Sequence, residues 1–100
     1  MIRHLVGWRW QEQLNTPQKE QAAKLLQEKF AQLKDKIPGA EWMQLEINML
    51  YTSAFDLVLN TVFATEEDLK AYQKNPDHEA VAAIVRTYTK DKTVIDFVEA

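Results

Sequence analysis

The segment from Leu69 to His78 carries two side chains that can move protons, Tyr72 and His78. Tyr72 shares a helical face with Leu69, three residues earlier, and His78 aligns with Val81 and Val85 at helical spacings. Both side chains are therefore predicted to point inward. A phenol that donates a proton and an imidazole that accepts one suit general acid–base catalysis. Tyr72 and His78 are the candidate catalytic residues.

The position of His78 bears on its charge. Asn75 followed by Pro76 is typical of a helix start, because asparagine caps the helix and proline needs no N–H partner there. His78 then lies in the first turn, where the helix dipole disfavours imidazolium and favours the neutral, proton-accepting form. The negative charges of Asp77 and Glu79 act in the opposite direction, because they favour the protonated imidazolium. The direction of the net shift in the His78 pKa is therefore a hypothesis.

A structural interpretation of the same residues stays open. A buried tyrosine often anchors a small helix, and a histidine near a helix start is often a packed core residue. If a site exists, the candidate ligand-binding residues are His4, Val6 and Trp8, which share one face of segment 2–10, together with Val81. Spacing alone does not decide whether His4 meets His78.

Metal chemistry has little support in the sequence. The two histidines form neither a His-x-His nor a His-Glu-x-x-His motif, so no metal site is predicted. Trp8, Trp10 and Trp42 suggest either a pocket for an aromatic ligand or core packing. We predict core positions, because bulky aromatic side chains in a small sheet protein more often serve packing.

Composition excludes several classes of function. The 100 residues contain no cysteine, only two glycines and one serine, Ser53, so thiolate sites, glycine-rich phosphate loops and common serine nucleophile motifs are absent. A net charge of −3 argues against binding nucleic acid. No run approaches the ~20 apolar residues of a membrane span. We expect a protein of the reducing cytoplasm, without a membrane or nucleic-acid partner.

Hydrophobic periodicity divides the chain into strands and helices. Thr16 is the expected cap of the first helix with Pro17 as its first residue, and Pro38-Gly39 ends it. The expected strands are 2–10, 41–51, 55–64 and 92–99, and the expected helices are 16–37, 65–72 and a segment that starts at Asn75-Pro76 and includes Tyr88. This order predicts a single α+β domain over residues 1–100, ferredoxin-like βαββαβ, with one four-stranded antiparallel sheet in the order 4-1-3-2.

The strand at 55–64 is apolar on both faces, but two helical layers cover only one face of the sheet. Leaving large apolar side chains in water costs about 1.5–3 kcal/mol each. We therefore predict a homodimer in which two sheets pack together. The alternative is a tightly twisted monomeric sheet whose second face is merely mixed.

Several segments together resemble the stress-responsive A/B barrel (Dabb) family. The resemblance spans nearly the whole chain and is carried by Ile2-Arg3-His4-Leu5-Val6, Phe55-Asp56-Leu57, the junction from Phe63 to Asp68, Tyr72, Pro76, His78 and Val94-Ile95-Asp96-Phe97. The chain departs from the family in having Asn75-Pro76-Asp77-His78 where His-Pro-x-His is frequent, and Asn48-Met49-Leu50 where Gly-x-Asn is frequent.

This resemblance implies a dimeric α+β barrel with a cavity between each sheet and its own helices. Plant polyketide cyclases of the family use a tyrosine and a histidine six residues apart for ring closure, and Tyr72 and His78 match those positions. The related antibiotic-biosynthesis monooxygenases work without metal or flavin, which implies that no cofactor is needed.

The sequence therefore predicts a homodimer that binds a small apolar or aromatic molecule, with cofactor-independent lyase or cyclase chemistry as the catalytic hypothesis. Two alternatives stay open. One is a stress-linked binding or interaction protein without turnover, and the other is a cofactor-independent barrel of the monooxygenase kind.

Overall fold

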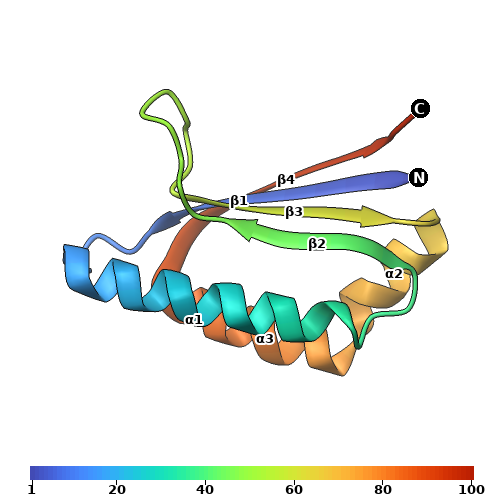
Figure 1. Cartoon of the computed structure of the whole chain (residues 1–100), viewed down its shortest axis with the longest axis horizontal. Coiled ribbons are helices and arrows are strands. Elements are labelled where there is room, and N and C mark those ends of the chain that lie inside the picture. The colour runs from blue at the N-terminus through green and yellow to red at the C-terminus, as the bar shows by residue number, and fades with distance from the viewer.

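Four antiparallel strands form one sheet, and three helices lie on one of its faces (Figure 1). The computed structural model describes all 100 residues. The elements are β1 (Ile2–Trp10), α1 (Thr16–Lys34), β2 (Ala40–Glu46), β3 (Leu57–Phe63), α2 (Glu66–Lys74), α3 (Pro76–Tyr88) and β4 (Thr89–Val98). The strand order β2-β3-β1-β4 is the predicted order read from the other edge, so the ferredoxin-like prediction is confirmed.

The first helix begins one residue earlier than predicted. Asn15, and not Thr16, is the N-cap: its side chain accepts from the Gln18 N–H at 2.9 Å, and the Gln18 side chain accepts from the Asn15 N–H at 2.9 Å. With Thr16 as the cap, the third helical position would be Lys19, whose ammonium cannot accept a hydrogen bond. The reciprocal capping box therefore selects Asn15.

The end of α1 also differs from the prediction. The helix stops at Lys34, and the turn through Pro38 and Gly39 follows it. Gly39 adopts a φ of 80°, and a Cβ there would lie 2.2 Å from the Asp68 side chain. Only glycine fits this turn, because both the backbone conformation and the space exclude a side chain.

The strand predicted over 41–51 ends at Glu46, and the prediction is wrong for its second half. The predicted alternation of buried and exposed side chains is present where β2 pairs with β3, as the buried Met43 and Leu45 show. Beyond Glu46, which pairs with Val58, there is no partner strand. The loop of residues 47–56 instead rises from the sheet on the side away from the helices (Figure 1), and its Tyr51 is 98% exposed.

A single asparagine joins the two C-terminal helices. Asn75 ends α2 through its N–H, which donates to the Tyr72 carbonyl at 3.1 Å, and its side chain accepts from the N–H groups of Asp77 and His78. The predicted cap at Asn75 is confirmed, and α2 extends two residues beyond the predicted end at Tyr72. The last strand starts at Thr89, three residues before the predicted Lys92, because α3 passes directly into β4.

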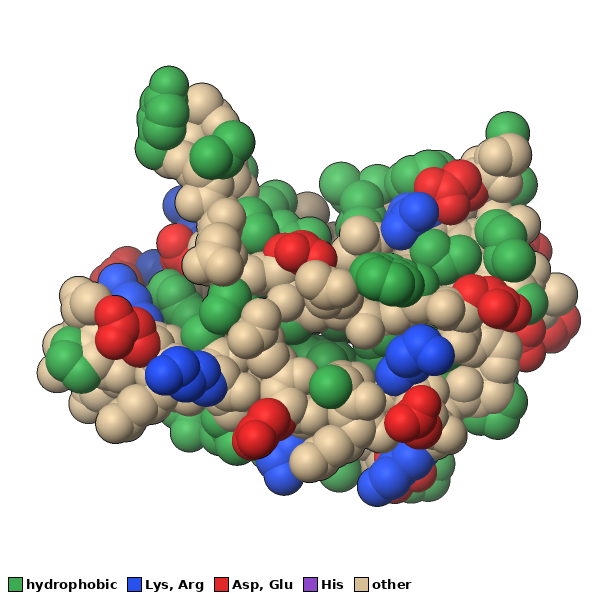
Figure 2. Space-filling model, in the orientation of Figure 1, with side chains coloured by type: hydrophobic (Ala, Val, Ile, Leu, Met, Phe, Trp, Pro, Cys, Tyr) green, Lys and Arg blue, Asp and Glu red, His purple; other side chains and the backbone are tan.

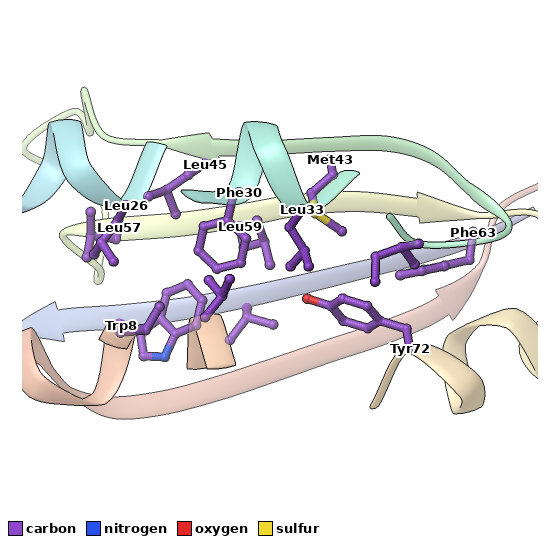
Figure 3. Close-up of a cluster of buried hydrophobic side chains, with 14 of the residues drawn as sticks. Trp8, Leu26, Phe30, Leu33, Met43, Leu45, Leu57, Leu59, Phe63 and Tyr72 are labelled. Carbon is purple, nitrogen blue, oxygen red and sulfur yellow. The ribbon is translucent and has the colours of Figure 1, made fainter. Parts of the chain in front are cut away.

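The hydrophobic core fills the space between the sheet and the helices (Figure 3). Sixteen buried side chains form one cluster, in which Leu57 and Phe63 of β3 are fully enclosed. Leu26, Phe30 and Leu33 supply the buried stripe of α1. The helical spacing of this stripe and the alternation in β3 thus direct their apolar side chains to the same layer.

No helix covers the opposite face of the sheet. On that face Trp42, Ile95 and Phe97 are 48%, 52% and 45% exposed. Figure 2 shows hydrophobic side chains along the upper side of the molecule, away from the helices, and at the tip of the loop that follows β2. We call Trp42, Ile95 and Phe97 the outer patch. None of the three helices has the length and apolar character needed to cross a membrane.

The layering predicts which leucine stabilises the fold. Leu57→Ala removes a fully buried side chain, and we expect it to lower the free energy of unfolding by about 2–5 kcal/mol. Leu50→Ala is the matched control: Leu50 is 75% exposed, and the change should stay within about 0.5 kcal/mol. Urea denaturation measures both variants. Equal losses would contradict the assignment of the core.

Candidate functional site

A cavity of about 260 Å³ lies between the inner face of the sheet and the C-terminal helices. The structure brings five of the six predicted site residues to its wall: His4, Val6 and Trp8 from β1, Tyr72 from α2 and His78 from α3. The remaining lining residues are Phe30, Leu59, Gln73, Ala82, Val85, Arg86, Thr89, Lys90, Asp91, Lys92 and Val94.

Val81 does not line this cavity. It is buried in the core and borders a smaller hollow between α1 and α3, beside Leu33 and Ile84. Successive helical residues turn by 100°, so Val81 lies about 60° around α3 from His78, whereas Val85 lies almost directly below it. The structure therefore places Val81 outside the wall of this cavity, and Val85 lies in the wall instead.

Tyr72 and His78 face each other across the junction at Asn75. Their ring centroids are 4.1 Å apart with an interplanar angle of 42°. The extended backbone of Asn75, with φ −68° and ψ 128°, turns the chain between the two helices. The last turn of α2 and the first turn of α3 therefore present their side chains to the same space.

Tyr72 is held in its protonated form. Its side chain is buried, and desolvation raises its pKa far above the ordinary value of 10. Figure 3 shows the Tyr72 ring extending from α2 with its hydroxyl directed toward the middle of the sheet. At neutral pH this residue can donate a hydrogen bond into the cavity, but it does not serve as a base.

His78 has the opposite character. Burial is the main cause that lowers its pKa below 6.5, and the charges of Lys92 and His4 lower it further, against the opposing effects of Glu79 and the Gln73 backbone. The Nδ1 atom of His78 is fully buried and has no hydrogen-bond partner. The imidazole is therefore neutral at pH 7 and can accept a proton.

Asp96 is a residue that the sequence reasoning did not assign to the site. It lies opposite His4 in the pairing of β1 with β4, and its carboxylate accepts a hydrogen bond from Nδ1 of His4. The His4 ring meets that of Tyr72 edge to face at 6.1 Å. The only signal in the sequence is a lone acid between apolar residues of the last strand. The register that places it beside His4 exists only in the folded sheet.

The tryptophans divide between the two faces of the sheet. Trp8 is buried and packs near Phe30, with ring centroids 6.4 Å apart, and Trp10 is partly buried. Trp42 is 48% exposed because its register opposite Val62 places it on the outer face. The core prediction is confirmed for Trp8 and wrong for Trp42. No three His, Asp or Glu side chains lie close enough together to hold a metal ion.

The sequence pattern of one family, described as Stress responsive A/B Barrel Domain (Dabb), matches residues 2–99. The chain belongs to the Dabb family. The match covers every strand and helix of the sheet-and-helix layer, together with the cavity between them. Among curated proteins, no sequence matches this Dabb chain.

Solved structures share the whole fold. A dimeric ferredoxin-like protein of unknown function from Bacteroides fragilis has a TM-score of 0.86 at 20% identity, over 96% of this chain and 93% of that one. A dimeric ferredoxin-like protein of unknown function from Thermobifida fusca has a TM-score of 0.79 at 25% identity, over 98% of this chain and 90% of that one. The hydroxynitrile lyase from Passiflora edulis has a TM-score of 0.79 at 13% identity, over 99% of this chain and 93% of that one.

The electrostatics of His78 can be tested directly by NMR titration of the imidazole. We expect a pKa below 6.5, and we expect Lys92→Gln to raise it because the variant removes a nearby positive charge. In the unaltered protein, the unfolded chain binds the His78 proton more readily than the folded chain does. Folding stability should therefore fall as the pH drops from 6.5 toward the pKa of His78 in the folded protein.

Lys24→Gln is the matched control for that titration. Lys24 is an exposed residue of α1 outside the cavity wall, so its loss should leave the His78 pKa unchanged. A His78 pKa above 6.5 in the unaltered chain would contradict the burial argument.

Proposed function

We propose that this Dabb chain works as a homodimer whose sheets pack through the outer patch. The support is the row of exposed apolar side chains on the face that no helix covers, Trp42, Ile95 and Phe97. Burying such side chains contributes about 1.5–3 kcal/mol each. Neighbours of the same fold from Bacteroides fragilis and Thermobifida fusca are described as dimeric.

Sedimentation equilibrium tests the dimer. We expect twice the 11.7 kDa of one chain at micromolar concentration. Phe97→Glu should shift the mass toward one chain, because it places a charge in the outer patch. Val98→Glu is the control, since Val98 lies opposite the inward-facing Ile2 and its side chain is on the other face. A single-chain mass for the unaltered protein would contradict the proposal.

We further propose that the cavity binds a small apolar or aromatic molecule and catalyses acid–base chemistry on it without a cofactor, as a lyase or cyclase. The observation that carries this proposal is the contact between a protonated Tyr72 and a neutral His78 in one cavity, half of whose lining residues are hydrophobic. Two titratable groups whose environments move their pKa values apart are the usual sign of an acid–base pair. The cysteine-free composition favours the cytoplasm as the place of this activity.

The chemistry proceeds by proton abstraction next to a carbonyl. His78 takes a proton from the activated carbon, and the electron pair moves onto the carbonyl oxygen, which accepts a hydrogen bond from Tyr72. In ring closure, the enolate carbon attacks a second carbonyl of the same molecule. The alkoxide that forms takes the proton back from His78, so no external oxidant or base is consumed.

His4 adds a second imidazole to the same cavity. Its hydrogen bond to Asp96 holds Nδ1 as the donor and fixes the orientation of the ring. The Thr61 hydroxyl donates to the His4 carbonyl at 2.6 Å and ties the backbone at this point to β3. We assign His4 to ligand binding, with Asp96 as its positioning residue.

A non-catalytic binding protein is the competing function, and the same packing of Tyr72 and His78 supports it. A hydroxynitrile lyase exists with this fold, in Passiflora edulis, so the architecture is compatible with turnover. Proton exchange separates the two functions, because a binding protein that merely seals its core does not accelerate exchange at carbon.

Phenylacetone is a suitable probe, being small, aromatic and activated at its benzylic carbon. We expect the protein to accelerate deuterium uptake at that carbon in D₂O, followed by NMR. His78→Gln should reduce the rate by about 10²–10⁴. Tyr72→Phe should reduce it by about 10²–10³, as for loss of a hydrogen-bond donor to the oxyanion.

Tyr51→Phe is the matched control for the tyrosine variant, because Tyr51 is 98% exposed in the loop after β2. It should leave the exchange rate unchanged. The rate should also decline on the acid side, as His78 becomes protonated below pH 6.5. If the unaltered protein binds phenylacetone without accelerating exchange, the binding function replaces the catalytic one.

A further inference from the structure

The opening of the cavity is positively charged, although the chain as a whole is not. The net charge is −3, with 15 acidic and 12 basic residues. Three of the basic residues, Arg86, Lys90 and Lys92, nevertheless line this one cavity, accompanied by a single acid, Asp91. Arg86, Asp91 and Lys92 are exposed, which places them at the rim rather than at the apolar floor.

Lys92 lies two residues before Val94, which pairs with Val6, so regular alternation along β4 directs it to the cavity face, and a β-bulge lies beside it at this rim. In the pairing of β1 with β4, Gly7 lies opposite Thr93 and Arg9 opposite Lys90, so two residues of β4 face only Trp8. Asp91, one of the two, has a φ of 55°. Such an extra residue redirects the side chains around it, and bulges are frequent beside functional sites. Lys92 and Trp8 line the same cavity.

Only one of the three cations at the rim is neutralised. The Lys90 ammonium is 2.7 Å from the Glu12 carboxylate, and this contact lowers the Glu12 pKa. Arg86 and Lys92 form no ion pair within 4.0 Å. The positive charge of Lys92 also lowers the pKa of the His78 imidazole inside the cavity. The rim thus presents two unpaired cations above an apolar, partly aromatic floor.

We propose that Arg86 and Lys92 bind an anionic oxygen group of the ligand, a carboxylate or a phosphate, while its apolar or aromatic body fills the space beside Trp8 and Val85. This inference rests on the proposed function, because it names the substrate class of the same cavity. Guanidinium and ammonium groups are the usual partners of carboxylate and phosphate oxygens. The anionic group stays at the rim in water, and the reacting carbon extends toward Tyr72 and His78.

Calorimetric titration with three probes of one shape tests the inference. The probes are 2-naphthoate, 2-naphthyl phosphate and the neutral 2-naphthamide, measured at low salt and again at high salt. Because both cations are exposed, water screens their charge pairs, and at least one anion should bind about threefold to tenfold more tightly than the amide. This preference should shrink at high salt. Which anion gains more identifies the group as carboxylate or phosphate.

Arg86→Gln and Lys92→Gln should each remove most of the anion preference and leave the affinity for 2-naphthamide unchanged. Lys24→Gln removes the same charge from an exposed site outside the cavity and should leave the preference intact. If all three probes bind equally to the unaltered protein, the anion site is wrong, but the cavity function stands. If none of the probes binds, both proposals fail.

Discussion

The hydrogen bonds of Asn75 are the constraint on which the site depends. Asn75 caps two helices. Its N–H donates to the Tyr72 carbonyl at the end of α2, and its side-chain oxygen accepts from the His78 N–H at the start of α3. The two functional side chains are therefore held relative to one another by one backbone and one side-chain hydrogen bond of Asn75, within the seven residues from Tyr72 to His78. The ring centroids of Tyr72 and His78 lie only 4.1 Å apart because the cap at Asn75 places the two helix ends together, and not because of a contact between distant parts of the chain.

The sheet then determines what these two side chains face. All helices lie on one face of the sheet, so the inward residues of β1, His4 among them, become the floor of the cavity, and Asp96 of β4 is hydrogen-bonded to the His4 ring. Burial acts on the two proton-transfer groups in opposite directions, keeping Tyr72 protonated and His78 neutral. The same one-sided layering exposes the outer patch. The catalytic proposal and the dimer proposal thus share one physical origin.

Local patterns in the sequence predict what local interactions determine. The strand order, the cap at Asn75 and the inward direction of Tyr72 and His78 follow from periodicity and helix-end chemistry. The alternation in β1 also puts His4, Val6 and Trp8 on one face, but only the folded sheet shows that this face is the inner one. The differences between prediction and structure lie where partners distant in sequence decide. The strand after Ala40 ends at Glu46 because β3 starts only at Leu57, and Val81 turns toward α1 because α1 packs there. Asp96 reaches His4, and Lys92 reaches the cavity beside Trp8, through the register of β4 on β1, which no local signal encodes.

A crystal structure with phenylacetone bound tests the central claim most directly, because it shows where a carbonyl compound lies relative to Tyr72 and His78. We expect the carbonyl oxygen within about 3 Å of the Tyr72 hydroxyl and the benzylic carbon beside the His78 imidazole. A ligand bound on the outer face of the sheet, or one in the cavity with its carbonyl turned away from Tyr72, would contradict this claim.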